Sequence, residues 1–388
     1  MKILVFAVRL AAQGFGVDLV IKQLAAVWES IGYDVTVGCV ISDIHSEKIN
    51  MVIEEEKSVL ELIERIQPNF IYIHTYPFWE YIPAIKKRFE NITVIMHDHG
   101  DPTPELFSNK QIKEFIKKQY LIRRESAKYA DRIITISEFI KADVGYKDSI
   151  NIHHGVENVP DLGFKKSVSA DKLKIGMLGR VGESENEYKG IKYFIEIAKS
   201  LDSNKFEFHF CGHGKLSDAK TLIDSGIQVR VNLSEEEKIN YLRGLDIFIS
   251  TSLWEGFNLP LLEAQALGTL SIVFDTGAHP EVSIFNFSNV FEIVHFIEEV
   301  EKNRELLLIY SNNCYTFVRS NFSWLKAALQ ILALNNNQKN IWSESINNLG
   351  KQRKLDVPYI KLLVKFIRDR GIIHFIVYGF KKVFRIKN

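Results

Sequence analysis

Cysteine is scarce in this chain, and its scarcity argues against two kinds of site. The 388 residues include three cysteines, Cys39, Cys211 and Cys314, and no Cys-X-X-Cys pair occurs. An odd number without that spacing indicates neither a disulfide framework nor a cysteine zinc site. We therefore expect a protein of the reducing cytoplasm.

Two other patterns are missing. No Asp-X-Asp triplet occurs, so the usual anchor for a complex of metal and diphosphate is lacking. The apolar residues 3–8 are followed at once by Arg9 and are too short for a signal peptide. The apolar stretch 371–380 is about half of the ~20 residues that a membrane span needs. We expect no bound metal and no membrane crossing.

The net charge of +1 hides an uneven distribution. Residues 351–388 hold eleven Lys/Arg and two Asp/Glu, against 38 and 46 in the rest of the chain. Basic residues recur at helical spacing among apolar and aromatic ones, which predicts an amphipathic helix docked on an anionic membrane through residues 357–388. The alternative is a helix packed across the first domain with a solvated basic face. Because the rest of the chain is acidic, nucleic acid is a poor partner.

Short apolar runs alternate with helical patterns, as parallel sheets with crossover helices require. This predicts an α/β protein with two Rossmann-like, doubly wound parallel-sheet domains facing a cleft. We place the domains at residues 1–160 and 171–334, followed by a linker and basic tail at 335–388. The candidate strands are residues 2–8, 34–40, 70–74, 93–97 and 132–136, then 174–178, 206–211, 246–250 and 270–274.

The most informative segment is DIFISTSLWEGFNLPLLEAQALGTLSIVFDTGAHPE, residues 246–281. It places Glu255 in the loop after a strand and Glu263 about one turn inside a helix that starts near Pro260, so both carboxylates can face the ligand crevice. The backbone N–H groups of Asn258 and Leu259 can hold phosphate oxygens. Glu263 suits the hydroxyls of a ribose. The alternative is that Glu263 is an exposed helix residue.

Together with other motifs, this segment resembles the donor site of the family-4 retaining glycosyltransferases. The start MKILVFAVRLAAQGFGVD resembles the first strand, glycine loop and helix of the family, and ADRIITISEFIK and INIHHGVE resemble the end of its first domain. IGMLGRVGESENEYKG and FHFCGHGKL resemble parts of its second domain. The resemblance covers most of residues 1–330. It implies the GT-B architecture and a nucleotide-diphosphate sugar as substrate, with no cofactor.

The resemblance also implies roles for two cations of the second half. Arg180 and Lys189 match residues that contact the donor phosphates, and their charges can neutralise a leaving diphosphate. The spacing between them is stretched, and Glu183, Glu185 and Glu187 lie in between. These carboxylates would repel a diphosphate unless the loop turns them outward. The alternative is that both cations are solvated surface charges.

In the first half, the resemblance implies roles for Gly16 and His97. Gly16 would let the backbone approach the donor, although Phe15 stands where another glycine is usual. His97 falls where the family has a histidine beside the reacting sugar, and a neutral imidazole can bind hydroxyls. His74 and His99 are alternatives for this role. The three histidines could instead bind a metal, or His97 could be a buried structural residue.

We therefore expect a retaining hexosyltransferase, with His97 and Glu255 as its catalytic residues. It would move a sugar from a nucleotide-diphosphate donor to a hydroxyl of a lipid-linked or cell-surface polysaccharide acceptor, at the inner face of the plasma membrane. Two alternatives are a catalytically inactive partner subunit that binds glycan or another transferase, and a sugar-nucleotide 2-epimerase.

Overall fold

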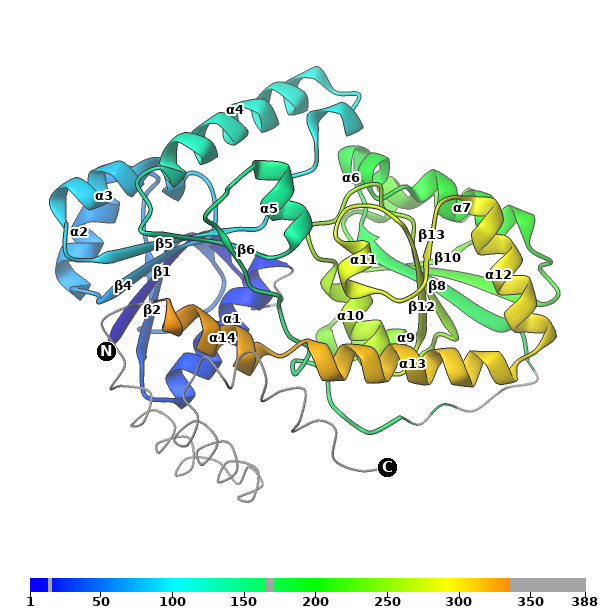
Figure 1. Cartoon of the computed structure of the whole chain (residues 1–388). Coiled ribbons are helices and arrows are strands. Elements are labelled where there is room, and N and C mark those ends of the chain that lie inside the picture. The colour runs from blue at the N-terminus through cyan, green and yellow to red at the C-terminus, as the bar shows by residue number, and fades with distance from the viewer. Residues whose placement is uncertain (13–15, 165, 167–170, 335–388) are drawn as a thin grey trace.

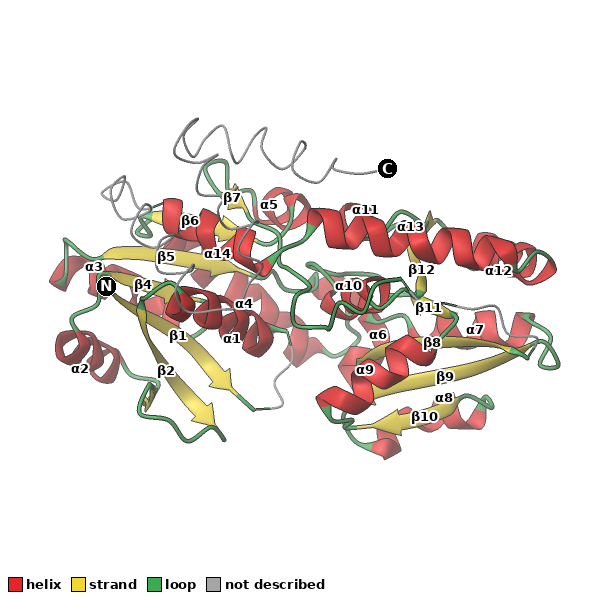
Figure 2. Ribbon diagram, turned by 90° about the horizontal axis from the view of Figure 1, so that it is seen from below, coloured by secondary structure: helices red, strands yellow, loops and turns green. Residues whose placement is uncertain are grey.

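Two parallel α/β domains lie side by side in the computed structural model (Figure 1). The structure describes residues 1–12, 16–164, 166 and 171–334. Within these ranges, each domain has one sheet whose strands all run parallel, and helices cover both faces of each sheet (Figure 2).

The first domain has a seven-stranded sheet in the order β3-β2-β1-β4-β5-β6-β7. This is the doubly wound order, in which the chain reverses direction beside β1 and opens a crevice at the carboxyl ends of the strands. Its strands are Lys2–Leu10 (β1), Asp34–Ser42 (β2), Ile49–Met51 (β3), Phe70–Ile73 (β4), Thr93–Asp98 (β5), Arg132–Thr135 (β6) and Ile150–Asn151 (β7). Its helices are Val17–Ser30 (α1), Glu56–Ile66 (α2), Ile82–Arg88 (α3), Lys110–Ala127 (α4) and Glu138–Val144 (α5), with 3₁₀ turns at Phe78–Tyr81 and Pro104–Leu106.

The second domain repeats this plan with a six-stranded sheet in the order β10-β9-β8-β11-β12-β13. Its strands are Leu173–Arg180 (β8), Phe206–His213 (β9), Gln228–Val231 (β10), Ile247–Ser250 (β11), Leu270–Phe274 (β12) and Asn286–Phe287 (β13). Its helices are Glu183–Tyr188 (α6), Ile191–Ser200 (α7), Lys220–Asp224 (α8), Glu235–Gly244 (α9), Leu259–Ala266 (α10), His279–Val282 (α11), Val290–Lys302 (α12) and Glu305–Asn321 (α13), with a 3₁₀ turn at Leu216–Ala219.

The predicted fold class is confirmed, and each of the nine candidate strands overlaps an observed strand. Four further strands were not predicted: β3, β7, β10 and β13. They are two to four residues long, they lie at the edges of the two sheets, and none of their residues is buried. Such short edge strands carry no apolar run for a sequence pattern to detect.

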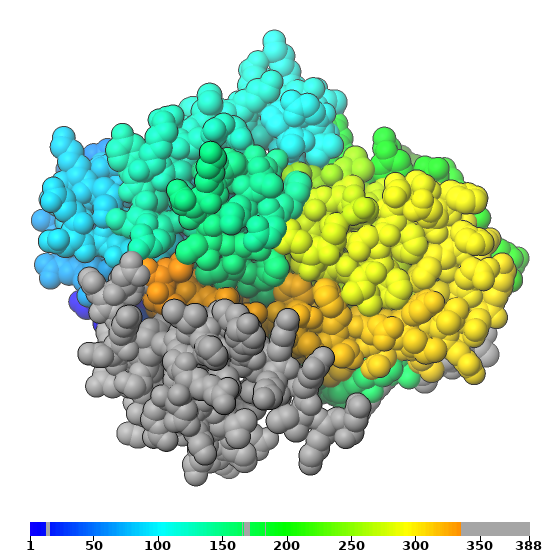
Figure 3. Space-filling model, in the orientation of Figure 1, coloured from blue at the N-terminus to red at the C-terminus, as the bar shows by residue number. Residues whose placement is uncertain are grey.

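The C-terminal helices connect the two domains. α13 packs on the second domain, and α14 (Trp324–Ala333) then crosses back to the first, as the orange segment of Figure 3 shows. The indole N–H of Trp28 in α1 donates to the carbonyl oxygen of Ala328 over 3.1 Å, and Trp324 and Ile331 are buried in the same core as Trp28. The sequence-based boundary at residue 334 assigned α14 to the second domain, whereas its apolar face is buried against the first.

A second link between the domains is made by Glu281 in α11. Its carboxylate accepts the backbone N–H groups of Glu138 and Phe139, at 2.9 and 2.8 Å, and lies 2.9 Å from the imidazole of His153. A carboxylate at the first turn of α5 is also favoured by the helix dipole. Glu281 thereby holds the second domain against the first.

The predicted linker and membrane-docking tail, residues 335–388, lie outside the described residues. Among the residues that the structure does describe, no helix combines the length and the apolar character needed to cross a membrane.

Candidate active site

A cavity of about 670 Å³ lies between the two domains. It is lined by loops that follow the carboxyl ends of strands in both sheets, which is where doubly wound folds bind ligands. From the first domain it is lined by Gly16 and His99, and from the second by Arg180, Lys189 and Glu255. These are groups that were predicted from distant parts of the sequence, and the fold brings them to one cavity.

The two domains touch closely beside Glu255. A Cβ atom on Gly256 would lie 2.6 Å from the carbonyl oxygen of His99, so this position has no room for a side chain. The glycine after Glu255 thus lets the loop of the second domain approach the histidine loop of the first.

Lys189 and Glu255 form an ion pair at the centre of the second-domain wall. The Lys189 Nζ lies 2.6 Å from the Glu255 Oε1, and the two side chains are 16% and 10% exposed. Burial tends to raise the pKa of Glu255. The electrostatic effect of Lys189, with a smaller one from His279, is opposite to that of burial and leaves the pKa of Glu255 below its ordinary value. Burial tends to lower the pKa of Lys189, but Glu255 leaves it raised. Each partner therefore keeps the other charged in a site with little water.

Arg180 ends strand β8 and extends into the same cavity. Its Nη2 donates to the hydroxyl of Tyr188 over 2.9 Å, and its side chain remains 56% exposed, which leaves donors for a ligand. Of the intervening carboxylates, Glu187 turns toward the first domain and accepts the backbone N–H of Ser108 at 2.8 Å. Glu185 lines the cavity 3.9 Å from Arg180. The loop therefore turns Glu187 away from a diphosphate but leaves Glu185 near it.

Glu263 lies in α10 and is 2% exposed. Its carboxylate accepts from the Asn158 Nδ2 at 2.7 Å and from the Lys238 Nζ at 3.2 Å. Burial raises its pKa, and Lys238 and Asn158 offset part of that effect. Lys238 itself lines the cavity. Glu263 is therefore not the exposed helix residue of the alternative interpretation, and it reaches the cavity wall through Lys238.

Asn258 sets the start of α10. It has left-handed backbone angles (φ 61°, ψ 70°), and its side-chain oxygen accepts the N–H of Leu261 at 3.2 Å. Its Nδ2 donates to the Nε2 of His279 over 2.9 Å and to the hydroxyl of Ser250 over 3.0 Å. Asparagine is among the few residues with a side chain that tolerate this left-handed backbone. Asn258 and Leu259 both line the cavity.

On the first-domain wall, Gly16 precedes α1 with a positive φ of 54° and lines the cavity. Beside it, Asp18 is buried and accepts from the Arg9 Nη2 at 2.7 Å. Glycine suits this position, because other residues rarely adopt a positive φ.

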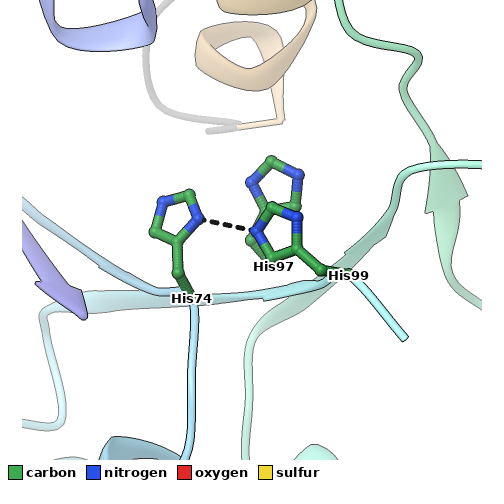
Figure 4. Close-up of side chains that lie close together, drawn as sticks. All are labelled: His74, His97 and His99. Atoms are coloured by element: carbon green, nitrogen blue, oxygen red, sulfur yellow. Dashed lines mark hydrogen bonds between the residues drawn. The ribbon is translucent and has the colours of Figure 1, made fainter. Parts of the chain in front are cut away.

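Three histidines lie together at the ends of strands β4 and β5 (Figure 4). His99 lines the cavity, whereas His74 and His97 are each about 1% exposed. The Nδ1 of His74 lies 3.0 Å from the Nε2 of His99. Burial lowers the pKa of His97 from its ordinary value to about 3, so the ring is neutral. The role predicted for His97 stays a prediction, and His99 is the histidine with direct access to the cavity.

Sequence reasoning did not identify four residues that shape this site. Lys238 and Asn158 hold Glu263, and His279 and Ser250 hold Asn258. His154 was not singled out either, although it also lines the cavity and its ring lies 5.8 Å from that of His99. His154 lies in INIHHGVE, a segment that resembles the end of the family's first domain, and this motif was the one signal that could have indicated it.

The chain is similar in sequence to known glycosyltransferases. Residues 172–289 match the family model described as "Glycosyl transferases group 1". An uncharacterized glycosyltransferase of Methanocaldococcus jannaschii is 25% identical over 265 residues, which is 62% of this chain and 67% of the relative.

Solved structures show the fold. The sucrose-phosphate synthase of Thermosynechococcus elongatus superposes with a TM-score of 0.71 at 14% identity, over 86% of this chain and 98% of that one. HepE of Anabaena, solved in complex with UDP-glucose, superposes with a TM-score of 0.67 at 15% identity, over the same shares of the two chains. The chain has the GT-B architecture of these proteins.

Proposed function

We propose that this glycosyltransferase, with its group 1 domain on a GT-B fold, transfers a sugar from a nucleotide-diphosphate donor, with retention, to a hydroxyl of a lipid-linked or cell-surface polysaccharide acceptor. The observation that carries the proposal is the cavity wall formed by Arg180, Lys189 and Lys238, with Glu255 and Glu263 paired to the two lysines. Cations with adjacent carboxylates suit a ligand that has both phosphates and hydroxyls.

Lys189 and Arg180 would bind the donor diphosphate. Without donor, Lys189 is held by Glu255 at 2.6 Å. A diphosphate would compete for Lys189 and release Glu255, whose carboxylate could then accept a hydroxyl of the donor sugar. After the exchange, Lys189 would be paired with a phosphate, and the carboxylate of Glu255 would be stabilised by a hydrogen bond from a sugar hydroxyl.

The leaving diphosphate carries growing negative charge as the glycosidic bond breaks. Fixed cations that already point at that charge stabilise it without reorganisation, and in our proposal Arg180 and Lys189 do this without a metal ion. Glu255 would face the reacting sugar from the second domain. His97 would face it from the first domain, with His99 between His97 and the cavity. Attack from the same face as the departing phosphate gives retention.

Glu263 would bind the ribose of the donor, with Lys238 beside it. The carboxylate is already fixed by Asn158, so little conformational entropy remains to be lost on binding. The backbone at Asn258 and Leu259, at the start of α10, would accommodate a phosphate oxygen. HepE, which shares this fold, was solved with UDP-glucose, and this supports a nucleotide sugar as the ligand.

The acceptor and the location rest on the sequence. The basic, apolar composition of residues 357–388 supports docking on the inner face of the plasma membrane, where a lipid-linked or polysaccharide acceptor would be reached. The enzyme would act there as a cytoplasmic, peripherally bound protein.

The test is a transfer assay with UDP-, GDP-, ADP- and TDP-sugars, membrane extract as acceptor, and EDTA throughout. Wild type is compared with Glu255→Gln and Glu263→Gln, which preserve side-chain shape. Glu299→Gln is the matched control, because Glu299 is half-exposed and pairs with Lys302 on the surface of α12. We expect one donor to release its nucleoside diphosphate and to transfer its sugar to the extract. NMR of the product should show the same anomeric configuration at the transferred sugar as in the donor. Both site variants should lose this activity and the control should keep it.

Two results would overturn the proposal. Nucleotide binding without turnover of any donor would indicate an inactive partner subunit. Conversion of the donor into its 2-epimer, with no sugar in the extract, would indicate an epimerase.

A further inference from the structure

The three histidines of Figure 4 are brought together by strand register. Strands β4 and β5 are parallel neighbours in which Ile73 pairs with Met96, so the next residues, His74 and His97, follow side by side. His99 lies two positions after His97 and therefore on the same face. The three rings have centroid separations of 4.7, 4.8 and 5.3 Å.

These rings have nitrogen atoms that lack hydrogen-bond partners. Both nitrogens of His97 and the Nε2 of His74 are buried and have no partner within the described part of the chain. Leaving a buried polar atom unsatisfied costs about 1–3 kcal/mol, and such atoms in a native protein call for an explanation such as an ion. An ion bound by one nitrogen of each ring would satisfy one of the two unpartnered nitrogens of the enclosed His97.

The geometry fits a metal ion. One ligand nitrogen from each ring lies within 4.8 Å of the other two, and the closest pair is 3.0 Å apart. With Zn–N bonds of about 2.0–2.1 Å, two nitrogens of a tetrahedral site are about 3.3 Å apart. The His97 and His99 rings are stacked at 16° and the His74 and His99 rings at 24°, so the rings would have to turn about their Cβ–Cγ bonds for three in-plane lone pairs to converge on one ion. Since His99 lines the cavity, a fourth position would open toward the cleft.

The three imidazole ligands and the charges around them favour a transition-metal ion. An imidazole has an ordinary pKa of about 6.5, so at neutral pH most such rings are neutral and have a lone pair to offer. The buried guanidinium of Arg123 is next to the site, but it pairs with two carboxyl groups, those of Asp98 and Asp101. Three imidazoles suit Zn²⁺, Co²⁺, Ni²⁺ or Cu²⁺, whereas Mg²⁺ and Ca²⁺ require oxygen ligands.

We propose that His74, His97 and His99 bind one first-row transition-metal ion, such as Zn²⁺, on the first-domain wall of the cleft. The ion would have three protein ligands and one open position for water or an acceptor oxygen. This site is separate from the donor diphosphate, which would be held by cations of the second domain. It does not depend on the proposed transfer reaction, because binding is measured on the protein alone.

The test uses full-length protein without a histidine tag, stripped with EDTA and then dialysed. Calorimetric titration with ZnCl₂ gives the stoichiometry, and the visible absorption of bound Co²⁺ reports a four-coordinate site. We expect one ion per chain in wild type, with affinity weakened at least about 10-fold in His97→Ala and in His99→Gln. His295→Ala is the matched control, because His295 is exposed on α12, and it should bind as wild type does.

Cavity-facing His99→Gln keeps the test valid if the more buried His97→Ala fails to fold, and a cooperative thermal transition checks each variant. Millimolar Mg²⁺ should not compete. No stoichiometric Zn²⁺ or Co²⁺ binding in wild type would overturn the proposal, and so would equal affinity in His99→Gln and wild type.

Discussion

The two walls of the cleft differ in how they compensate their polar groups. The second-domain wall consists of ion pairs, with Lys189 held by Glu255 and Lys238 by Glu263. The first-domain wall combines the Arg9–Asp18 ion pair beside Gly16 with a group of neutral histidines around His99, and His97 behind it has no hydrogen-bond partner among the described residues. Where a lysine is paired with a carboxylate, a phosphate of the ligand can take the place of that carboxylate. A wall of neutral imidazoles is suited to hydroxyls or to a metal ion.

This contrast assigns the two halves of the proposed reaction. The charged wall would bind the donor and stabilise the leaving group, and the neutral wall would face the acceptor and the transferred sugar. The following predictions test this division, beginning with the largest expected effect.

The largest effect is expected at Lys189. Lys189→Ala removes a proposed phosphate ligand and leaves Glu255 buried without its cation, so we expect kcat/KM for the donor to fall by about 100-fold or more. Steady-state kinetics with varied donor measures this. Lys192→Ala is the control, because Lys192 is an exposed lysine of α7. Similar kinetics in the two variants would contradict the role of Lys189.

Glu263 should contribute both to the stability of the fold and to the affinity for the donor. Glu263→Ala removes the buried partner of Lys238 and leaves its ammonium group paired with the half-exposed Glu235 at 2.8 Å, so we expect a loss of about 2 kcal/mol in the free energy of unfolding. The double variant Lys238→Met/Glu263→Gln removes both charges and should recover much of that stability. It should not recover donor affinity. Denaturant unfolding and calorimetric nucleotide binding separate the two effects, and recovery of both would show that the pair is only structural.

Acid should weaken the second domain through His279. Its Nε2 accepts from Asn258 and its Nδ1 donates to the carbonyl of Phe274 over 2.8 Å, so protonation removes an acceptor. Burial lowers the pKa of His279, despite opposing effects led by Glu255. The unfolded chain therefore takes up this proton first.

The stability tied to neutral His279 is complete above the ordinary pKa of about 6.5. As pH falls below that value, it is lost by up to about 1.4 kcal/mol per pH unit. Unfolding curves between pH 7 and about pH 5 should therefore be less pH-dependent in His279→Gln than in wild type. Identical pH dependence would exclude this contribution.

A smaller effect is expected at Asn258, which combines a left-handed backbone with a helix cap. Asn258→Ala loses the cap and replaces asparagine, which tolerates a left-handed backbone, by a residue that tolerates it less well, at a cost of about 2 kcal/mol. Asn258→Gly relieves the backbone strain and should cost about 1 kcal/mol or less. Thermal unfolding ranks the variants, and a glycine variant less stable than the alanine variant would contradict this explanation.

Much of the fold and part of the site could be predicted from sequence. The core strands were detectable because each is a continuous apolar run, and Glu255 and Glu263 because they flank one strand-to-helix junction. The partners of these residues were not detectable. Asn158 lies 105 residues before Glu263, and nothing local indicates that the two side chains meet.

The histidine cluster illustrates the same limit. His97 and His99 are two positions apart in the sequence, but His74 joins them only through the register of β4 and β5. Sequence patterns predict that strands exist, whereas register depends on packing across the whole sheet. The unpartnered nitrogens of His97 could be recognised only once the surrounding atoms were placed.

The most direct test is to measure nucleotide binding by variants with a substitution in one wall or in the other. Calorimetric titration with UDP, GDP, ADP and TDP, in EDTA, compares wild type with Lys189→Ala and His99→Gln. The account predicts that wild type binds a nucleoside diphosphate without metal, that Lys189→Ala binds it at least about 10-fold more weakly, and that His99→Gln binds it as wild type does. Binding that requires a divalent metal, or that is lost in His99→Gln and kept in Lys189→Ala, would contradict the division of the cleft into a charged donor wall and a neutral acceptor wall.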